Sequence, residues 1–113
     1  MVGTPYRWGG ATPQGFDCSG LVVYSYNAAG ITGLPHSARR LRAITVPVQL
    51  SEVQAGDLLF FELSGRKTSH VAIYVGQQRF VHAPSSGKSV EKVSFDHVYW
   101  GKQLERASVG RVH

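Results

Sequence analysis

The only cysteine of this chain, Cys18, stands where a glycine-rich segment meets an apolar run. Residues 15–20 read Gly-Phe-Asp-Cys-Ser-Gly, and residues 21–29 have helical character. We therefore expect a helix that starts at the cysteine, with Asp17 as its N-cap and Gly30 at its end. A helix N-terminus stabilises an anion, so this position favours the thiolate. A lone cysteine is more often a small buried apolar residue, but this setting indicates a nucleophile.

A nucleophilic thiol needs a base, and two histidines on neighbouring predicted strands could provide one. Residues 69–76 alternate in the manner of a strand, and residues 79–83 form the next strand. His70 opens the first strand and His82 lies in the second. Taken singly, each histidine would more often be structural. Together with a cysteine at a helix start, the pair favours catalysis.

The loop between these strands decides whether the two histidines meet. A two-residue loop would pair Ile73 with His82 and place the histidines on opposite faces of the hairpin. A three-residue loop with a bulge would pair Ala72 with His82, so that His70 and His82 share a face. We expect the second arrangement, in which one histidine is the base beside Cys18 and the other orients it.

The rest of the pattern predicts an α+β fold. A short helix is expected near residues 37–43, after the cysteine helix. Residues 57–62 are almost continuously apolar and read as a strand buried on both faces. Further strands are expected at 88–94 and 103–109. Helices first and a hairpin-connected sheet afterwards give one α+β domain over residues 1–113.

Composition supports a single modest core. The 113 residues are 42% hydrophobic and 17% charged, and no segment has the apolar length of a membrane span. The formal net charge of +5 raises the question of nucleic acid. However, the basic residues are scattered apart from Arg39, Arg40 and Arg42, which read as a solvated helix face, and no RNA-binding or zinc-finger pattern accompanies them. We therefore expect no nucleic-acid partner.

Several blocks of the sequence, in order, resemble the motifs of the NlpC-like bacterial cell-wall peptidases of the papain-like superfamily. The blocks are Thr4–Gly10 with Gly15–Val22, then Ala55–Phe61, then Ser69–Gly76, and finally Phe80–Ala83. The resemblance covers nearly the whole chain. It implies a papain-like fold, in which the nucleophile helix packs on a central antiparallel sheet of about five or six strands. The helix that usually precedes the first block is nearly absent here.

The resemblance implies a cysteine peptidase. Cys18 would be the nucleophile, His70 the general base and His82 the polar group that orients the base. The substrate would be an amide bond in a peptidoglycan stem peptide, commonly that from γ-D-glutamate to diaminopimelate or lysine, cut through a thioester. No cofactor and no metal would be required.

Other residues are expected around the thiol. The backbone N–H groups of Cys18 and Ser19 would stabilise the oxyanion. The resemblance places the Tyr6 hydroxyl near the sulfur, and His36 where the family usually has a small polar or basic residue near the cleft. Asp17 is either the N-cap alone or also, with Tyr6, the partner of a free terminal ammonium, because a buried carboxylate without a cation is costly.

The family works outside the cytoplasm, so we expect a bacterial periplasmic, cell-envelope or secreted protein that acts as a monomer. Residues 1–5 carry neither a basic region nor an apolar stretch. We expect that an export signal, lipid anchor or partner domain has been trimmed away or lies in a longer precursor.

Three alternatives stay open. The chain could be a CHAP-type amidase that cuts the sugar-to-L-alanine bond or a cross-bridge. It could be a wall-binding module that has lost activity. Finally, Cys18, His70 and His82 could form a zinc site, although no two of them have the close spacing typical of zinc ligands.

Overall fold

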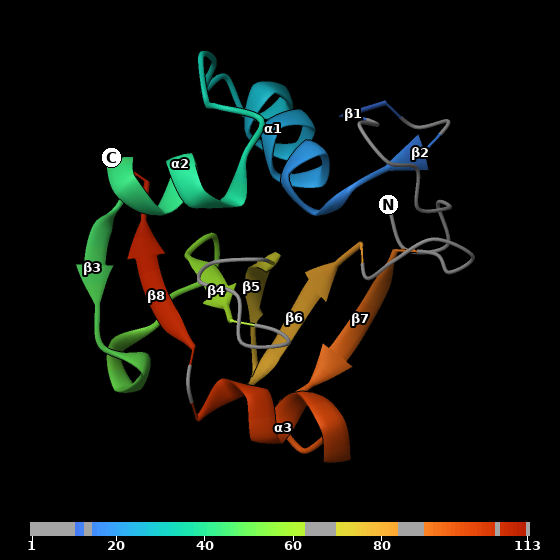
Figure 1. Ribbon diagram of the computed structural model, residues 1–113, viewed down its shortest axis with the longest axis vertical. Helices are drawn as coiled ribbons and strands as arrows, with labels where there is room; N and C mark the ends of the chain where they lie inside the picture. The colour runs from blue at the N-terminus through green and yellow to red at the C-terminus, as the bar shows by residue number, and fades with distance from the viewer. Residues whose placement is uncertain (1–10, 13–14, 63–69, 84–89, 106, 113) are drawn as a thin grey trace.

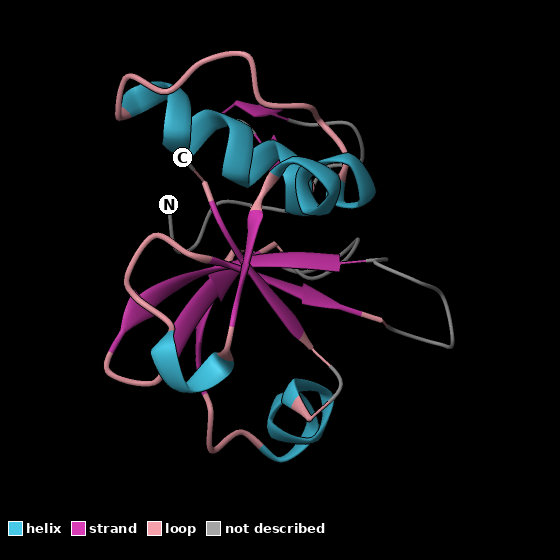
Figure 2. Cartoon of the chain, turned by 90° about the vertical axis from the view of Figure 1, so that its left-hand side faces the viewer, coloured by secondary structure: helices cyan, strands magenta, loops and turns pink. Residues whose placement is uncertain are grey.

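A six-stranded antiparallel sheet runs through the middle of the protein, with helices on both sides of it (Figures 1 and 2). The computed structural model describes residues 11–12, 15–62, 70–83, 90–105 and 107–112. Helices α1 (Cys18–Ala28) and α2 (Ala38–Ile44) cover one side of the sheet, and α3 (Val98–Leu104) covers the other. None of the helices in these residues is both long and apolar enough to span a bilayer. The predicted α+β architecture and the expected number of strands are confirmed.

The sheet has the strand order β3-β8-β4-β5-β6-β7, so the last strand of the chain lies inside the sheet between two earlier ones. Two very short strands, β1 and β2, pair separately just before α1. The strands are β1 (Ala11–Thr12), β2 (Gly15–Phe16), β3 (Val46–Val48), β4 (Leu58–Phe61), β5 (His70–Gly76), β6 (Arg79–His82), β7 (Glu91–Ser94) and β8 (Ser108–Arg111), and a 3₁₀ turn, η1 (Leu50–Glu52), follows β3.

The core has two layers because β4 is buried on both faces, as its sequence predicts. Leu58 and Phe60 face α1 and α2, where they pack with Val22, Leu41 and Val71. On the opposite face, Leu59 and Phe61 pack with residues of β5, β6 and α3, which are Ala72, Tyr74, Phe80, Trp100 and Leu104. The sheet therefore holds the cysteine helix on one side and an aromatic layer on the other.

The C-terminal region corrects the sequence prediction. The strand expected at 103–109 is wrong, because α3 continues to Leu104 and β8 begins only at Ser108. Trp100 and Leu104 are four residues apart, so a helix buries both on the same face. His97 starts this helix, since its ring nitrogen Nδ1 accepts a hydrogen bond from the Trp100 N–H at 3.3 Å. Strand β3 was not expected either. The sequence also predicts polar loops at 64–67 and 85–88, and both lie outside the described residues.

Gly110 shows how closely α2 approaches the sheet. A Cβ atom at this position would lie only 2.1 Å from the Thr45 hydroxyl oxygen and 3.0 Å from the Phe60 ring. Thr45 is the residue on which α2 ends. Only glycine therefore lets the end of α2 sit on the middle of β8.

Candidate active site

Helix α1 begins at Cys18, as the sequence predicts. The Asp17 carboxylate oxygen Oδ1 accepts a hydrogen bond from the Gly20 N–H at 2.7 Å, which is the N-cap interaction. The Asp17 backbone carbonyl accepts from the Leu21 N–H at 3.0 Å. The cysteine is thus fixed in the first helical turn, where its own N–H and that of Ser19 have no acceptor within the helix.

The Cys18 thiol is a neutral group in this setting. Burial raises its pKa above the ordinary value, and the negative charge of Asp17 raises it further. The backbone N–H groups of Val71, Ser19 and Cys18 lower the pKa, but they do not outweigh burial. The helix start favours the thiolate as expected, but the pKa is raised overall because loss of water is the larger effect here.

The same contacts place the thiol beside the start of β5. The backbone N–H of Val71 belongs to the peptide bond that joins Val71 to His70, and this N–H lies near enough to the sulfur to lower the pKa of the thiol. Cys18 also packs against the apolar cluster that contains Val22 and Val71. The fold in this way brings Cys18 and His70, which are 52 positions apart in the chain, to the same end of the sheet.

The hairpin between β5 and β6 differs in detail from the prediction. The loop has two residues, Gln77 and Gln78, with φ values of 54° and 58°, and the paired residues Gly76 and Arg79 flank it. Positive φ at both central residues is the geometry of a type I′ turn. The register then shifts between Tyr74 and Gly76, so one residue of β5 is unpaired. The expected three-residue loop is wrong, and the bulge lies inside the strand instead.

The shifted register nevertheless produces the expected pairing. Ile73 pairs with Val81, which puts His82 across from Ala72. His70 and His82 consequently share a face, and His70 Nε2 lies 2.7 Å from His82 Nδ1. The predicted meeting of the two imidazoles is confirmed.

Both histidines are deeply buried and neutral at neutral pH. Burial lowers the pKa of His70 to about 3, and the neighbouring His82 contributes to the shift. Burial also lowers the pKa of His82 to about 4, with a smaller contribution from His97. His82 Nε2 lies 2.9 Å from Glu91 Oε1, a distance that would suit an ion pair. Because the ring is neutral, however, this contact is a hydrogen bond to the carboxylate.

An aromatic layer encloses the two imidazoles. The Trp100 ring centroid lies 5.4 Å from that of His70 and 4.6 Å from that of His82. Phe61 lies 5.9 Å from His70, and Phe80 lies 5.2 Å from His82. These rings exclude water, which is the physical cause of the lowered pKa values. Sequence analysis missed the part played by Trp100 because it placed no helix at 98–104.

Glu91 is a second residue that sequence analysis missed. It lies directly across from His82 in the pairing of β6 with β7. The sequence predicted a strand at 88–94 but left open which residues share a face. Only the observed register shows that this carboxylate faces the histidine.

His36 joins the start of α1 from a different part of the chain. Its Nε2 lies 2.7 Å from Asp17 Oδ1, the same oxygen that caps the helix. The next residue, Ser37, is the N-cap of α2. The structure therefore brings together Asp17, Cys18 and His36, and Ser19 lies buried in the same helical turn. Tyr6 lies outside the described residues.

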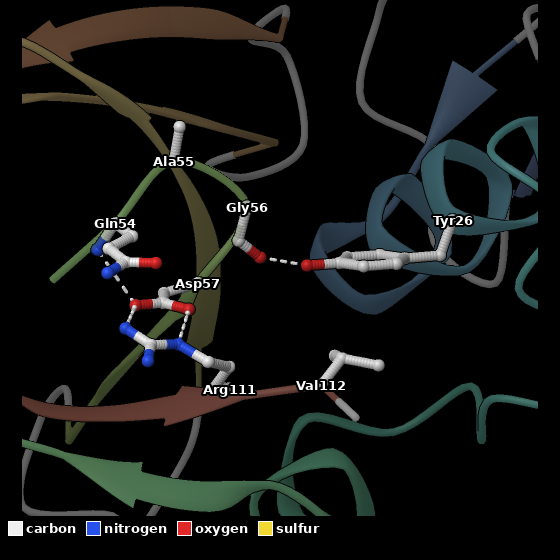
Figure 3. A pocket seen from close by; sticks show the side chains of 7 residues that line it. All are labelled: Tyr26, Gln54, Ala55, Gly56, Asp57, Arg111 and Val112. Atoms are coloured by element: carbon white, nitrogen blue, oxygen red, sulfur yellow. Dashed lines mark hydrogen bonds and ion pairs between the residues drawn. The ribbon is translucent and has the colours of Figure 1, made fainter.

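A separate hollow of about 270 Å³ lies near the other end of α1 (Figure 3). The Tyr26 hydroxyl donates to the Gly56 carbonyl, and the Asp57 carboxylate takes two hydrogen bonds of 2.9 Å from the Arg111 guanidinium. Burial opposes ionisation of Asp57, but these bonds outweigh it and lower its pKa. These contacts tie α1 to the start of β4. No described side chain of the candidate site lines this hollow. The residues that line it are Tyr26, Gln54, Ala55, Gly56, Asp57, Arg111 and Val112.

The zinc alternative finds no support in the geometry. In the described parts of the chain, no group of three or more His, Cys, Asp or Glu side chains is arranged to hold a metal ion. His70 Nε2 and His82 Nδ1 are hydrogen bonded to each other.

Comparison with known proteins identifies the family of this chain. The sequence profile of the NlpC/P60 family matches residues 3–109. The chain belongs to the NlpC/P60 family. A crystal structure of an NlpC/P60 family protein from Bacillus cereus has a TM-score of 0.86 and 32% sequence identity to it, over 99% of this chain and 36% of that one.

Two curated NlpC/P60 relatives carry named activities. The chain is 41% identical over 104 residues to the murein DD-endopeptidase MepH of Escherichia coli, a match that covers 88% of this chain and 38% of MepH. It is 42% identical over 113 residues to the bifunctional muramidase/DL-endopeptidase CwlT of Bacillus subtilis, which covers 97% of this chain and 33% of CwlT. The chain thus spans well under half the length of either relative.

Proposed function

We propose that this NlpC/P60 chain hydrolyses an amide bond in peptidoglycan stem peptides, with Cys18 as the nucleophile. The observation that carries the proposal is the packing of Cys18, in the first turn of α1, against the cluster that contains Val71, the residue that follows His70 at the start of β5. The hydrogen bond between His70 and His82 supplies the third member of a nucleophile, base and orienter set. The family and the named endopeptidase relatives support the same chemistry.

The proposed reaction starts from a neutral thiol and a neutral imidazole. His70 Nε2 is engaged with His82, so Nδ1 is the atom that accepts the thiol proton as the sulfur attacks the carbonyl carbon. The first-turn N–H groups of Cys18 and Ser19 stabilise the oxyanion. The protonated His70 then transfers the proton to the departing amine. Water then hydrolyses the thioester.

The proposed bond is that from γ-D-glutamate to diaminopimelate or lysine. The two relatives differ in the names of their activities, one a DD-endopeptidase and the other a DL-endopeptidase. Because the two relatives are about equally identical to this chain, sequence identity does not indicate which bond the chain cuts. The choice depends on which peptide the cleft binds. We place the enzyme at the bacterial cell envelope, where this substrate lies, acting as a monomer without a cofactor.

Recognition of a free amino terminus is part of the proposal. Asp17 carries a carboxylate beside the nucleophile, and its Oδ1 already accepts from Gly20 and faces His36. A substrate ammonium that approaches Asp17 competes with His36 for the same carboxylate. His36 is partly exposed, with 35% of its side-chain surface accessible, so it can turn away when an ammonium binds.

Digestion of defined muropeptides, with the products read by mass spectrometry, tests the proposal. We expect the wild-type protein to release the two halves of the γ-D-glutamyl bond and Cys18→Ala to release neither, with an unchanged circular dichroism spectrum. Because Cys18 is the only cysteine, one equivalent of an iodoacetamide-type reagent should abolish the activity. Hydrolysis by Cys18→Ala would refute the nucleophile. Cleavage of the sugar-to-L-alanine bond by the wild type would instead identify an amidase.

A further inference from the structure

Glu91 stands behind the two histidines in a line of hydrogen bonds. His70 Nε2 lies 2.7 Å from His82 Nδ1, and His82 Nε2 lies 2.9 Å from Glu91 Oε1. His82 is completely buried, whereas the Glu91 side chain is 47% exposed. The position of the carboxylate follows from the fold, because Glu91 pairs directly with His82 in the sheet and cross-strand partners project to the same face.

A neutral imidazole carries one N–H and one bare nitrogen, so each ring in this line can hold its proton in two ways. If His82 carries its proton on Nδ1, its Nε2 turns a lone pair toward the carboxylate of Glu91, and the two repel. If it carries the proton on Nε2, that N–H donates to Glu91. Its bare Nδ1 then accepts the N–H of His70 Nε2. The remaining nitrogen of His70, Nδ1, is left without a proton.

We propose that Glu91 is a positioning residue that holds the proton on His82 Nε2, and through it on His70 Nε2, so that His70 Nδ1 is free to act as the base. The inference rests on the proposed peptidase function for its consequence, but the proton positions are a property of the resting protein. Asp17 and His36 are hydrogen bonded to each other and do not enter this line. Without a carboxylate at position 91, nothing in the line distinguishes the two proton arrangements of His82.

Nitrogen NMR of protein labelled with ¹⁵N-histidine tests the proton positions without any substrate. In the wild type we expect His70 and His82 both to show an N–H at Nε2 and a bare nitrogen at Nδ1. In Glu91→Leu we expect His82 to populate both forms, and in Glu91→Gln to keep the Nε2 form, because the amide oxygen still accepts. An N–H at Nδ1 of His82 in the wild type, or an unchanged spectrum in Glu91→Leu, would overturn the proposal.

Kinetics then tests the consequence. We expect Glu91→Leu to lower kcat about tenfold while KM changes less than about twofold, since Glu91 acts through His82 and His70. Glu91→Gln should recover most of kcat. Glu105→Leu, which removes an exposed glutamate from the end of α3, is the control and should match the wild type. Equal kcat values for Glu91→Leu and the wild type would overturn the role, whereas a wild type inactive on every muropeptide would refute the proposed function and leave the NMR result standing.

Discussion

His70 Nε2 lies 2.7 Å from His82 Nδ1 because β5 contains one extra, unpaired residue opposite β6, which forms a β-bulge. The two-residue turn at Gln77 and Gln78 by itself sets a register in which they would lie on opposite faces. The bulge at Val75 shifts that register by one residue. Every property of the candidate site that depends on two adjacent imidazoles therefore depends on this irregularity.

The two histidines should differ in their importance. We expect His70→Ala to lower kcat/KM by roughly 10²-fold to 10⁴-fold, the usual contribution of a general base, and His82→Ala by about tenfold to a hundredfold, since His82 acts through His70. His82→Asn should be less impaired than His82→Ala because its amide oxygen can accept the His70 N–H. Steady-state kinetics on one muropeptide ranks the three variants. A larger loss for His82→Ala than for His70→Ala would reverse the assignment of base and orienter.

Stability should fall as the solution becomes acidic. The pKa values of His70 and His82 in the folded protein are about 3 and about 4, below the ordinary 6.5 of an unfolded chain. Between these values the unfolded chain binds protons that the folded one does not, so stability is present above pH 6.5 and is lost as the pH falls. For each proton that only the unfolded chain binds, the free energy of unfolding falls by up to about 1.4 kcal/mol per unit decrease in pH.

Urea unfolding at a series of pH values measures this slope. His82→Asn removes one of the two groups and should flatten the dependence, whereas His97→Gln, at an exposed position, should change it less. A free energy of unfolding that stays constant or rises from about pH 6.5 down to about pH 4.5 would contradict the neutral buried state of both rings.

Trp100 should matter far more than its neighbour. Trp100→Ala removes the ring that packs on both imidazoles and should lower the free energy of unfolding by about 3 kcal/mol. Trp100→Phe should lose less, because it retains an aromatic ring. Tyr99→Ala, at a side chain that is 50% exposed, should cost under about 1 kcal/mol. Chemical denaturation compares the three, and similar losses for Trp100→Ala and Tyr99→Ala would show that the aromatic layer does not support the site.

Asp17 should decide between free and blocked peptides. We expect strong preference for a stem peptide with a free L-alanine amine over the same peptide acetylated or attached to its sugar. Asp17→Asn should reduce this preference more than it reduces the thermal midpoint, since asparagine is also a good N-cap. His36→Gln should retain the preference, because it leaves the carboxylate in place. Competition assays with the free and the blocked peptide in one mixture measure this preference. Equal cleavage of the two peptides by the wild type would reject recognition of the amine.

Local sequence determined the pieces of the site. The Asp17 cap and the apolar run behind it specify a helix that begins at Cys18, because capping and helix formation involve residues within one or two turns of each other. The continuous apolar run in β4 specifies a strand buried on both faces. The alternation around His70 and around His82 likewise specifies two strands and a hairpin.

Tertiary structure decided how the pieces work. The charge states of Cys18, His70 and His82 follow from burial among α1, the sheet and the aromatic layer under α3, and desolvation by distant segments is not encoded next to any one residue. Glu91 reaches His82 only through the register of β6 with β7, which a change of one residue would turn to the other face. Sequence determined which groups are present, and packing determined where their protons lie.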